Sequence, residues 1–142
     1  MSKGNTFEND LLKAIFNGTN IANLLDNAAS APLTNLYVSL HTADPGETGD
    51  QTTSEATYTG YARVAVARTA GGWVVTANSV SPVAVIEFPN GTGGSGTITH
   101  GAIGTAPTGA GKILYSGTVT PNIVSGNGVQ PRLTTASTIT ED

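Results

Sequence analysis

Several residue types that carry chemistry in proteins are missing or scarce in this sequence. The 142 residues include no cysteine, two histidines and only six lysines and arginines. Without cysteine the chain forms neither a disulfide nor a thiolate metal site, so packing and hydrogen bonds must stabilise its fold. A net charge of −4 offers little attraction to nucleic-acid phosphates or to an anionic membrane surface. We therefore expect neither nucleic acid nor membrane as a partner.

Charge and long apolar runs are scarce as well. Charged residues make up 11% of the chain, against about 25% in a typical globular domain. No run approaches the roughly 18 apolar residues of a membrane-spanning helix, and the first residues do not resemble an export signal. The sequence is instead rich in Thr, Val, Gly and Asn, which favour strands and tight turns. This composition predicts a mainly β fold, and the length predicts a single domain over residues 1–142.

One short α-helix is predicted at the amino terminus, over residues 5–17. Phe7, Leu11 and Ile15 follow the 3.6-residue period of a helix, and Gly18 is placed where glycine ends many helices. The other apolar positions in this segment are Leu12, Ala14 and Phe16. An apolar face of this width must pack on something, which is either the protein's own sheet or another subunit. A shorter helical turn is expected over residues 20–26.

The period of the apolar residues changes to two after residue 32. Leu36, Val38 and Leu40 alternate with polar residues, which predicts a half-buried strand. Residues 61–69 and 73–77 flank Ala70-Gly71-Gly72 and predict a hairpin. Further strands are expected at residues 83–88, 97–103, 113–120 and 132–140. Short strands between turn clusters predict an antiparallel β-sandwich, resembling a jelly roll, over about residues 35–140.

A long loop without apolar rhythm is expected at residues 42–57. It carries four carboxylates, Asp44, Glu47, Asp50 and Glu55, and long loops in small domains are commonly functional. These carboxylates fit a solvated loop, a contact with another chain or a calcium ion, although their spacing matches no standard calcium loop. We predict no metal site from them and include Asp44, Glu47 and Asp50 among candidate interface residues.

No complete catalytic or cofactor motif is present. Residues 106–113, APTGAGKI, resemble a phosphate-binding loop, but the first glycine and the Ser or Thr after the lysine are both absent. His41 and His100 both fall on predicted strands, and no serine lies in a nucleophile elbow. We therefore predict no catalytic, cofactor-binding or metal-binding residues and no enzyme activity.

The three arginines, Arg63, Arg68 and Arg132, stand out in so charge-poor a chain. An arginine can hold a partner's carboxylate through two parallel hydrogen bonds, so these residues are candidates for ion pairs across an interface. A role in surface solubility is the alternative. With the apolar helix stripe and the acidic loop, they complete the predicted interface set: Phe7, Leu11, Ile15, Asp44, Glu47, Asp50, Arg63, Arg68 and Arg132.

Three segments resemble a family of virion structural proteins from tailed phages and prophages. They are LYVSLHTADPG at residues 36–46, YTGYAR at 58–63 and SVSP at 79–82. The similarity runs from NTFE at residues 5–8 to PRLT at 131–134. Members are variously described as tail-fibre or capsid decoration proteins. The resemblance implies a virion protein made in the bacterial cytoplasm, with no catalytic or cofactor residues.

Two positions on the virion fit a chain of this size. A decoration or cement protein binds the outside of the major capsid protein shell and other copies of itself, and many weak contacts then stabilise the particle. The small size and the lack of a coiled coil or repeats favour this role over a fibre shaft. A tail-fibre or tail-adaptor protein that binds tail proteins is the alternative. A carbohydrate-binding module is a further alternative. The rings that could stack on a sugar are Trp73, Tyr37, Tyr58, Tyr61 and Tyr115.

Overall fold

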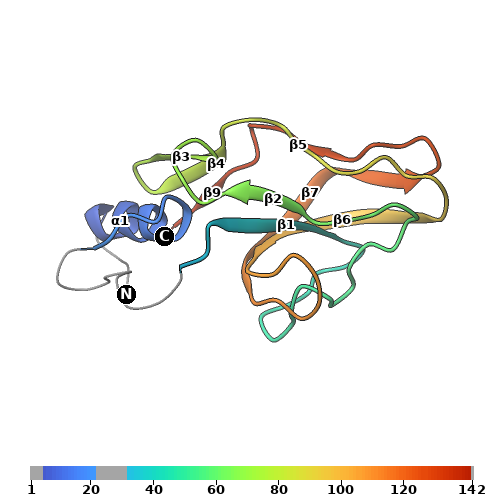
Figure 1. Ribbon diagram of the computed structural model, residues 1–142, viewed down its shortest axis with the longest axis horizontal. Helices are drawn as coiled ribbons and strands as arrows, with labels where there is room; N and C mark the ends of the chain where they lie inside the picture. Colours follow the sequence, from blue (N-terminus) through green and yellow to red (C-terminus); the bar gives the residue numbers. More distant parts are fainter. Residues whose placement is uncertain (1–4, 22–31, 142) are drawn as a thin grey trace. The chain divides into compact units, whose positions relative to one another are not determined.

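The computed structural model describes residues 5–21 and 32–141, which are mainly β (Figure 1). Within these residues one helix, α1 (Asn5–Phe16), precedes nine strands. The strands are β1 (Asn35–His41), β2 (Val64–Ala67), β3 (Trp73–Thr76), β4 (Ser79–Pro82), β5 (Ile86–Glu87), β6 (Ser95–Gly104), β7 (Ile113–Gly126), β8 (Arg132–Leu133) and β9 (Ile139–Thr140). The prediction of a mainly β, antiparallel fold with a short amino-terminal helix is confirmed, while the jelly-roll arrangement stays a prediction.

The chain divides into two compact units. Unit 1 comprises the described residues up to 35 together with 67–86 and 133–141, and unit 2 comprises residues 36–66 and 87–132. Unit 1 contains α1 and a sheet with the order β3-β4-β9. The four-stranded sheet β2-β1-β6-β7 forms most of unit 2, and β5 pairs with β8 in a sheet of two strands. The single domain expected over residues 1–142 stays a prediction.

Unit 1 has its own apolar core between α1 and the strands β3 and β4. Leu12 and Phe16 are completely buried, and Trp73 is 2% exposed. The rings of Phe16 and Trp73 meet edge to face, with centroids 4.9 Å apart. Asn9 donates from Nδ2 to the carbonyl of Ala77 over 2.6 Å and fixes the helix to the β3–β4 turn. The amino-terminal helix therefore packs within its own chain.

The carboxyl end of α1 is capped by Arg68. Its guanidinium donates to the carbonyl oxygens of Ala14 and Ile15, the latter over 2.6 Å, and to that of Leu33 over 3.4 Å. The last carbonyls of a helix have no partner within the helix, and their dipoles favour a cation there. Arg68 thus joins the end of α1 to the segment that leads into β1.

The hairpin predicted from residues 61–69 and 73–77 is wrong. The glycines do form a turn, in which Gly72 donates to the carbonyl of Thr69 over 2.9 Å. However, β2 pairs with β1, and β3 pairs antiparallel with β4. β2 and β3 do not pair with each other, because Trp73 at the start of β3 packs on α1 in the core of unit 1. The hairpin that does form turns at Ala77, which has a positive φ of 53°.

Other predicted strands differ mainly in length. The strand expected at 83–88 shrinks to β5, and the one expected at 132–140 is divided into β8 and β9. The strand expected at 113–120 is longer and continues to Gly126. A shift in its register with β6, between Ile98 and His100, accommodates the residues around Pro121. The helical turn predicted over 20–26 lies mostly outside the described residues.

Strand β1 is more deeply buried than its alternating pattern predicts. Leu36, Val38 and Leu40 are buried as expected, but Ser39 and His41 are buried too. Residues 42–57, which we call the acidic loop, fold back beside the end of β1. Ala56 donates to the carbonyl of Leu40 over 2.8 Å. The carbonyl of Thr53, in the same loop, is 2.8 Å from Nδ1 of His41. The loop therefore covers the end of the β1 face that the sequence pattern assigns to solvent.

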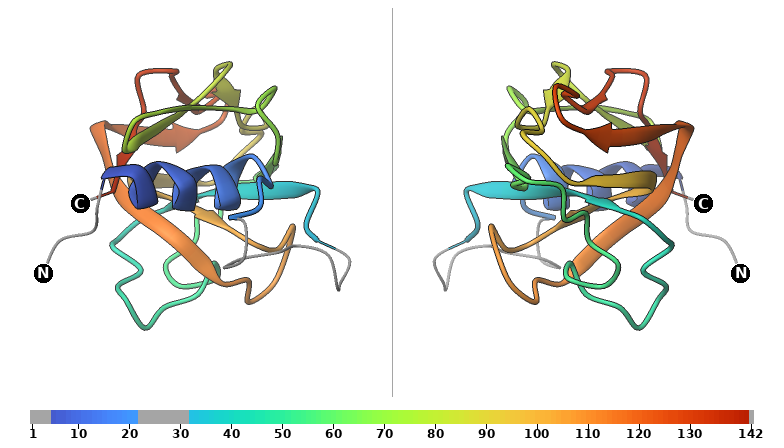
Figure 2. Two further views of the ribbon diagram at one scale, coloured as in Figure 1. Left: turned by 90° about the vertical axis from the view of Figure 1, so that its left-hand side faces the viewer. Right: turned by 90° about the vertical axis from the view of Figure 1, so that its right-hand side faces the viewer.

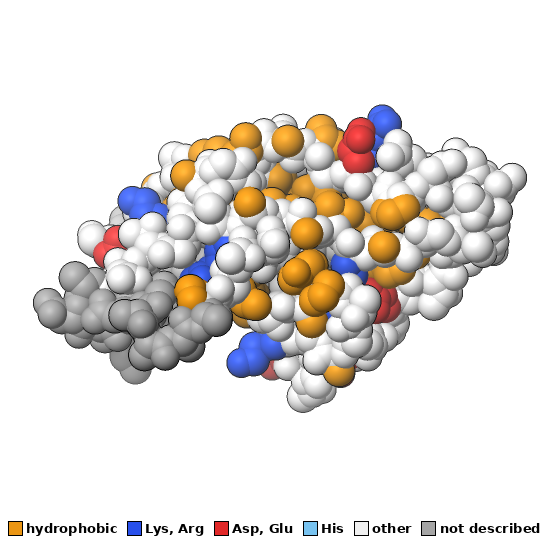
Figure 3. All heavy atoms as spheres, viewed as in Figure 1, with side chains coloured by type: hydrophobic (Ala, Val, Ile, Leu, Met, Phe, Trp, Pro, Cys, Tyr) orange, Lys and Arg blue, Asp and Glu red, His pale blue; other side chains and the backbone are white. Residues whose placement is uncertain are grey.

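No helix in the described ranges is long and apolar enough to cross a membrane. Charged side chains are sparse on the molecular surface in view in Figure 3, as the composition predicts.

Candidate functional site

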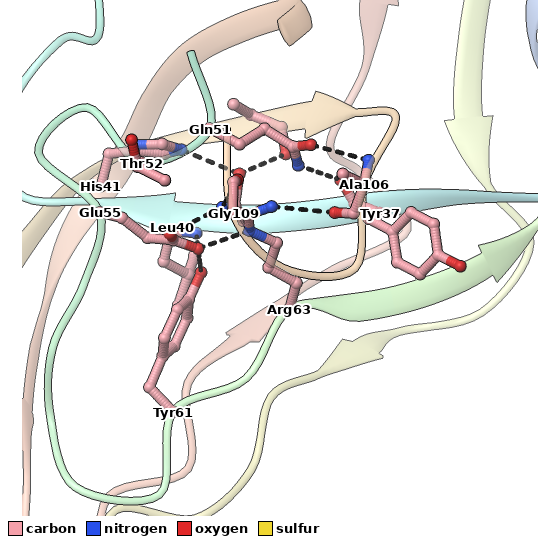
Figure 4. A network of polar contacts seen from close by, with 12 residues as sticks. Tyr37, Leu40, His41, Gln51, Thr52, Glu55, Tyr61, Arg63, Ala106 and Gly109 are labelled. Atoms are coloured by element: carbon pink, nitrogen blue, oxygen red, sulfur yellow. Dashed lines mark hydrogen bonds and ion pairs between the residues drawn. The ribbon is translucent and has the colours of Figure 1, made fainter. Parts of the chain in front are cut away.

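A buried polar network in unit 2 centres on Arg63 (Figure 4). The Arg63 side chain is 2% exposed and binds the Glu55 carboxylate at two points, from Nε over 2.6 Å and from Nη2 over 2.8 Å. It also donates to the carbonyls of Ala106 and Gly109, over 2.9 and 2.8 Å. These carbonyls belong to residues 105–112, which we call the β6–β7 loop. One guanidinium therefore joins the acidic loop to the β6–β7 loop.

Tyr61 links the same carboxylate to the sheet. Its hydroxyl donates to Oε1 of Glu55 over 2.9 Å and accepts the backbone N–H of Leu40 over 3.1 Å. Burial raises the pKa of Tyr61, so its phenol stays protonated and remains a donor. Hydrogen bonding to Glu55 raises the pKa of Arg63, which keeps the guanidinium charged. The pair is therefore a fixed charge-assisted contact in which each partner has further hydrogen bonds.

Gln51 forms a second clamp between the two loops. Its side chain is completely buried although it lies in the acidic loop. Nε2 donates to the carbonyl of Tyr37 over 3.2 Å, and Oε1 accepts the N–H of Ala106 over 3.0 Å. Its backbone N–H donates to the carbonyl of Gly111 over 2.9 Å. Both the nitrogen and the oxygen of the carboxamide thus have hydrogen-bond partners, and the side chain joins the acidic loop to β1 and to the β6–β7 loop.

Two glycines make room for the Gln51 side chain. A Cβ built on Gly104 would lie 2.2 Å from Cδ of Gln51, and one built on Gly111 would lie 2.1 Å from its Oε1. The Cβ on Gly111 would also lie 2.7 Å from that of Ala106. All of these distances are shorter than van der Waals contact. Any side chain at either glycine would therefore displace the carboxamide from its partners.

We expect Gly111→Ala to destabilise unit 2 by about 1 to 3 kcal/mol, the usual cost of overpacking a filled site. The clash is with Gln51, so Gln51→Ala combined with Gly111→Ala should cost less than the sum of the two single changes. Gly117→Ala is the matched control, because a Cβ there meets nothing within 4 Å. Urea unfolding of the four variants provides the comparison. Additive costs, or an equal loss in Gly117→Ala, would show that Gln51 is not wedged between the glycines.

A buried Ser–His pair lies on β1 next to the network. The Ser39 hydroxyl is 2.9 Å from Nε2 of His41, and Nδ1 of His41 is 2.8 Å from the carbonyl of Thr53. A serine beside an oriented imidazole is the geometry of a nucleophile and its base. Both side chains are completely buried, however, and desolvation lowers the pKa of His41. The contacts therefore describe a neutral imidazole that fixes the acidic loop to β1.

Parts of both clamped loops are exposed to solvent. Residues 107–110 of the β6–β7 loop are exposed, as are Asp44 and Glu47 of the acidic loop. Oδ1 of Asp44 accepts the N–H of Gly46 over 2.9 Å. Asp50 accepts the hydroxyl and the N–H of Thr52, and these bonds lower its pKa. Asp44 and Asp50, two of the three predicted acidic interface residues, thus also shape the loop through hydrogen bonds within it.

The predicted interface residues divide by place. On α1, Phe7 is 39% exposed and Leu11 and Ile15 are partly exposed, whereas Leu12 and Phe16 are buried. Arg63 and Arg68 bind a carboxylate and carbonyl groups within the chain, as described above. Arg132 lies at the surface and pairs with Glu87 over 3.0 Å. The structure therefore leaves an apolar helix stripe, two exposed carboxylates and one exposed arginine accessible.

Sequence reasoning missed most of the loop clamp. Gln51, Glu55 and Tyr61 carry no motif, and the glycines at 104 and 111 look like ordinary turn residues. One signal was available: Arg63 is one of three arginines in a chain with few charges, and the guanidinium group can bind a carboxylate through two hydrogen bonds.

A family model described as Podophage GP4 fiber I protein gp80 matches residues 2–140. The match covers nearly the whole chain and thus both units. No curated protein matches the sequence.

Proposed function

This chain belongs to the family of podophage GP4 fiber I proteins, and from that premise we propose that it is a fibre component bound to other tail proteins of the virion. The family establishes the coarser statement directly: the protein is a structural component of a tailed-phage virion. The observation that carries the proposal is the match of the fiber family to residues 2–140.

Capsid decoration, the role expected first from the sequence, has less support than the fibre alternative. The sequence favoured decoration because a 14.3 kDa chain without coiled coil or repeats is too short for a fibre shaft. A small module at the base or tip of a fibre needs no shaft either. Size therefore does not separate the two roles, and the family description favours the fibre.

We propose that the protein acts by binding and has no catalytic activity. The buried Ser39 and His41 offer a substrate no access, since neither side chain is exposed. Unit 2 instead presents two loops held by Arg63 and Gln51. Loops that are fixed before contact lose little conformational entropy on binding, which favours a stable structural interface. The exposed parts of these loops, and the Phe7 stripe of α1, are the surfaces that we assign to partner proteins.

Carbohydrate binding through Trp73 is not favoured by its environment. A ring that stacks on a sugar needs one free face, whereas Trp73 is 2% exposed and packs against Phe16. Tyr58, another candidate ring, is 3% exposed. Trp73 and Tyr58 thus belong to the cores of units 1 and 2.

Deleting the gene from a phage that encodes this chain tests the proposal. We expect particles with intact, DNA-filled heads that lack a tail appendage in electron micrographs and adsorb poorly to cells. Supplying the protein in trans should restore both properties. Particles with normal tails whose heads break more readily on heating would instead identify a decoration protein.

A further inference from the structure

The sheet of unit 2 has two edge strands that differ sharply in length and charge. At one edge, β2 has four residues and is immediately preceded by Arg63 and followed by Arg68. At the other edge, β7 has 14 residues, and none of the chain's six basic and ten acidic residues lies in it. Figure 2 shows β7 as the long orange strand.

An edge strand exposes backbone N–H and C=O groups that can pair with a further strand. In the described part of the chain β7 is hydrogen-bonded to β6 on one side and has no strand on the other. Proteins commonly protect such edges by keeping them short, by charge or by proline. The edge at β2 has the first two kinds of protection. At β7, Pro121 interrupts the strand only after the eight residues 113–120.

One row of side chains on β7 is also exposed. Ser116, Thr118 and Thr120 alternate along one face of the strand, and all three are exposed. Val124, farther along, is 68% exposed. Threonine and valine favour strands, and pairs of Thr and Ser across two strands stabilise a sheet. Residues 113–120 therefore combine high strand propensity and neutrality with one exposed row of small polar side chains.

We propose that β7 is a self-association surface, on which residues 113–120 pair antiparallel with the same residues of a second copy of this chain. A two-fold axis brings each edge strand against itself, so a charged strand would meet its own charge. The absence of charge from β7, in a chain of net charge −4, removes that repulsion. The pairing joins two four-stranded sheets into one sheet across the two copies.

A second copy fits this edge better than a strand from another protein. Selective capture of a foreign strand commonly uses pockets or charges that recognise its side chains. The face of β7 with Ser116, Thr118 and Thr120 offers small hydroxyl groups, which are complementary to themselves.

The test is sedimentation of the purified full chain between about 1 and 200 µM, the range in which modest self-association becomes visible. We expect the wild-type protein to dimerise as its concentration rises. Ser116→Lys/Thr118→Lys/Thr120→Lys brings like charges together at the edge and should weaken dimerisation about tenfold or more. The matched control, Thr135→Lys/Ser137→Lys/Thr138→Lys, adds the same charge at exposed residues outside β7 and should dimerise like the wild type.

Hydrogen exchange of the wild-type protein gives a second measurement that needs no variant. Amides of residues 113–120 should exchange more slowly at high than at low concentration, while those of β2 should not change. A wild-type chain that stays monomeric throughout would overturn the proposal and favour a strand from another protein at this edge. Equal weakening of dimerisation in both lysine variants would also overturn it.

Discussion

Arg63→Ala is expected to lower the free energy of unfolding by about 3 to 5 kcal/mol, the cost of leaving a buried charge without its partner. The change deprives Glu55, whose side chain is 18% exposed, of its counter-ion. It also leaves the carbonyls of Ala106 and Gly109 without their donor. Chemical unfolding of the purified variants, followed by circular dichroism, measures the loss.

Arg132→Ala is the matched control for this prediction. Arg132 also pairs with a glutamate, Glu87, but their side chains are 55% and 52% exposed. Exposed ion pairs contribute about 1 kcal/mol or less, so this variant should unfold almost like the wild type. Arg63→Lys should be intermediate, because a single ammonium cannot reproduce the fork of the guanidinium. Equal losses in Arg63→Ala and Arg132→Ala would contradict the clamp that we describe.

Trp73→Ala is expected to cost about 3 to 5 kcal/mol, as for other large aromatic side chains removed from a core. Trp73 packs edge to face on Phe16 and anchors α1 to β3. Its indole N–H is buried without an acceptor in the described residues. Trp73→Phe retains the ring contact and removes that donor, so it should cost much less than Trp73→Ala.

The neighbouring Val74 provides the control for the core of unit 1. Its side chain points to the opposite face of β3 and is 47% exposed, so Val74→Ala should change stability by about 1 kcal/mol or less. Trp73 is the only tryptophan in the sequence, and its fluorescence reports on unit 1 in Val74→Ala and the wild type. If Trp73→Ala were tolerated as well as Val74→Ala, α1 would not be anchored through this ring.

Helix α1 and the buried face of β1 were predictable because their residues repeat with a helical or strand period. Which strands pair with each other was not predictable from the sequence. Gly71 and Gly72 have the local sequence of a hairpin turn. Trp73 packs instead on Phe16 of α1, which lies 57 residues earlier in the sequence. Local pattern contains no information about that competition, so β2 and β3 were paired wrongly.

The loop clamp was unpredictable for a related reason. A glutamine in an acidic, glycine-containing loop is normally exposed. Gln51 is buried because Tyr37 and Ala106, from distant parts of the chain, satisfy its carboxamide, and because Gly104 and Gly111 leave space for it. Each condition is visible only when the loops are folded together. The resemblance of residues 36–46 to virion proteins, in contrast, could be read from the sequence directly.

Cross-linking mass spectrometry of intact virions tests the fibre assignment most directly, because it identifies both the neighbours of this chain and its abundance. The surfaces assigned to partner proteins include reactive groups, since the exposed Lys112 ends the β6–β7 loop and Lys13 lies on α1. We predict cross-links from these lysines to tail proteins, with few copies of the chain in each particle. Cross-links to the major capsid protein, with the chain nearly as abundant as that protein, would contradict the fibre assignment and restore the decoration role.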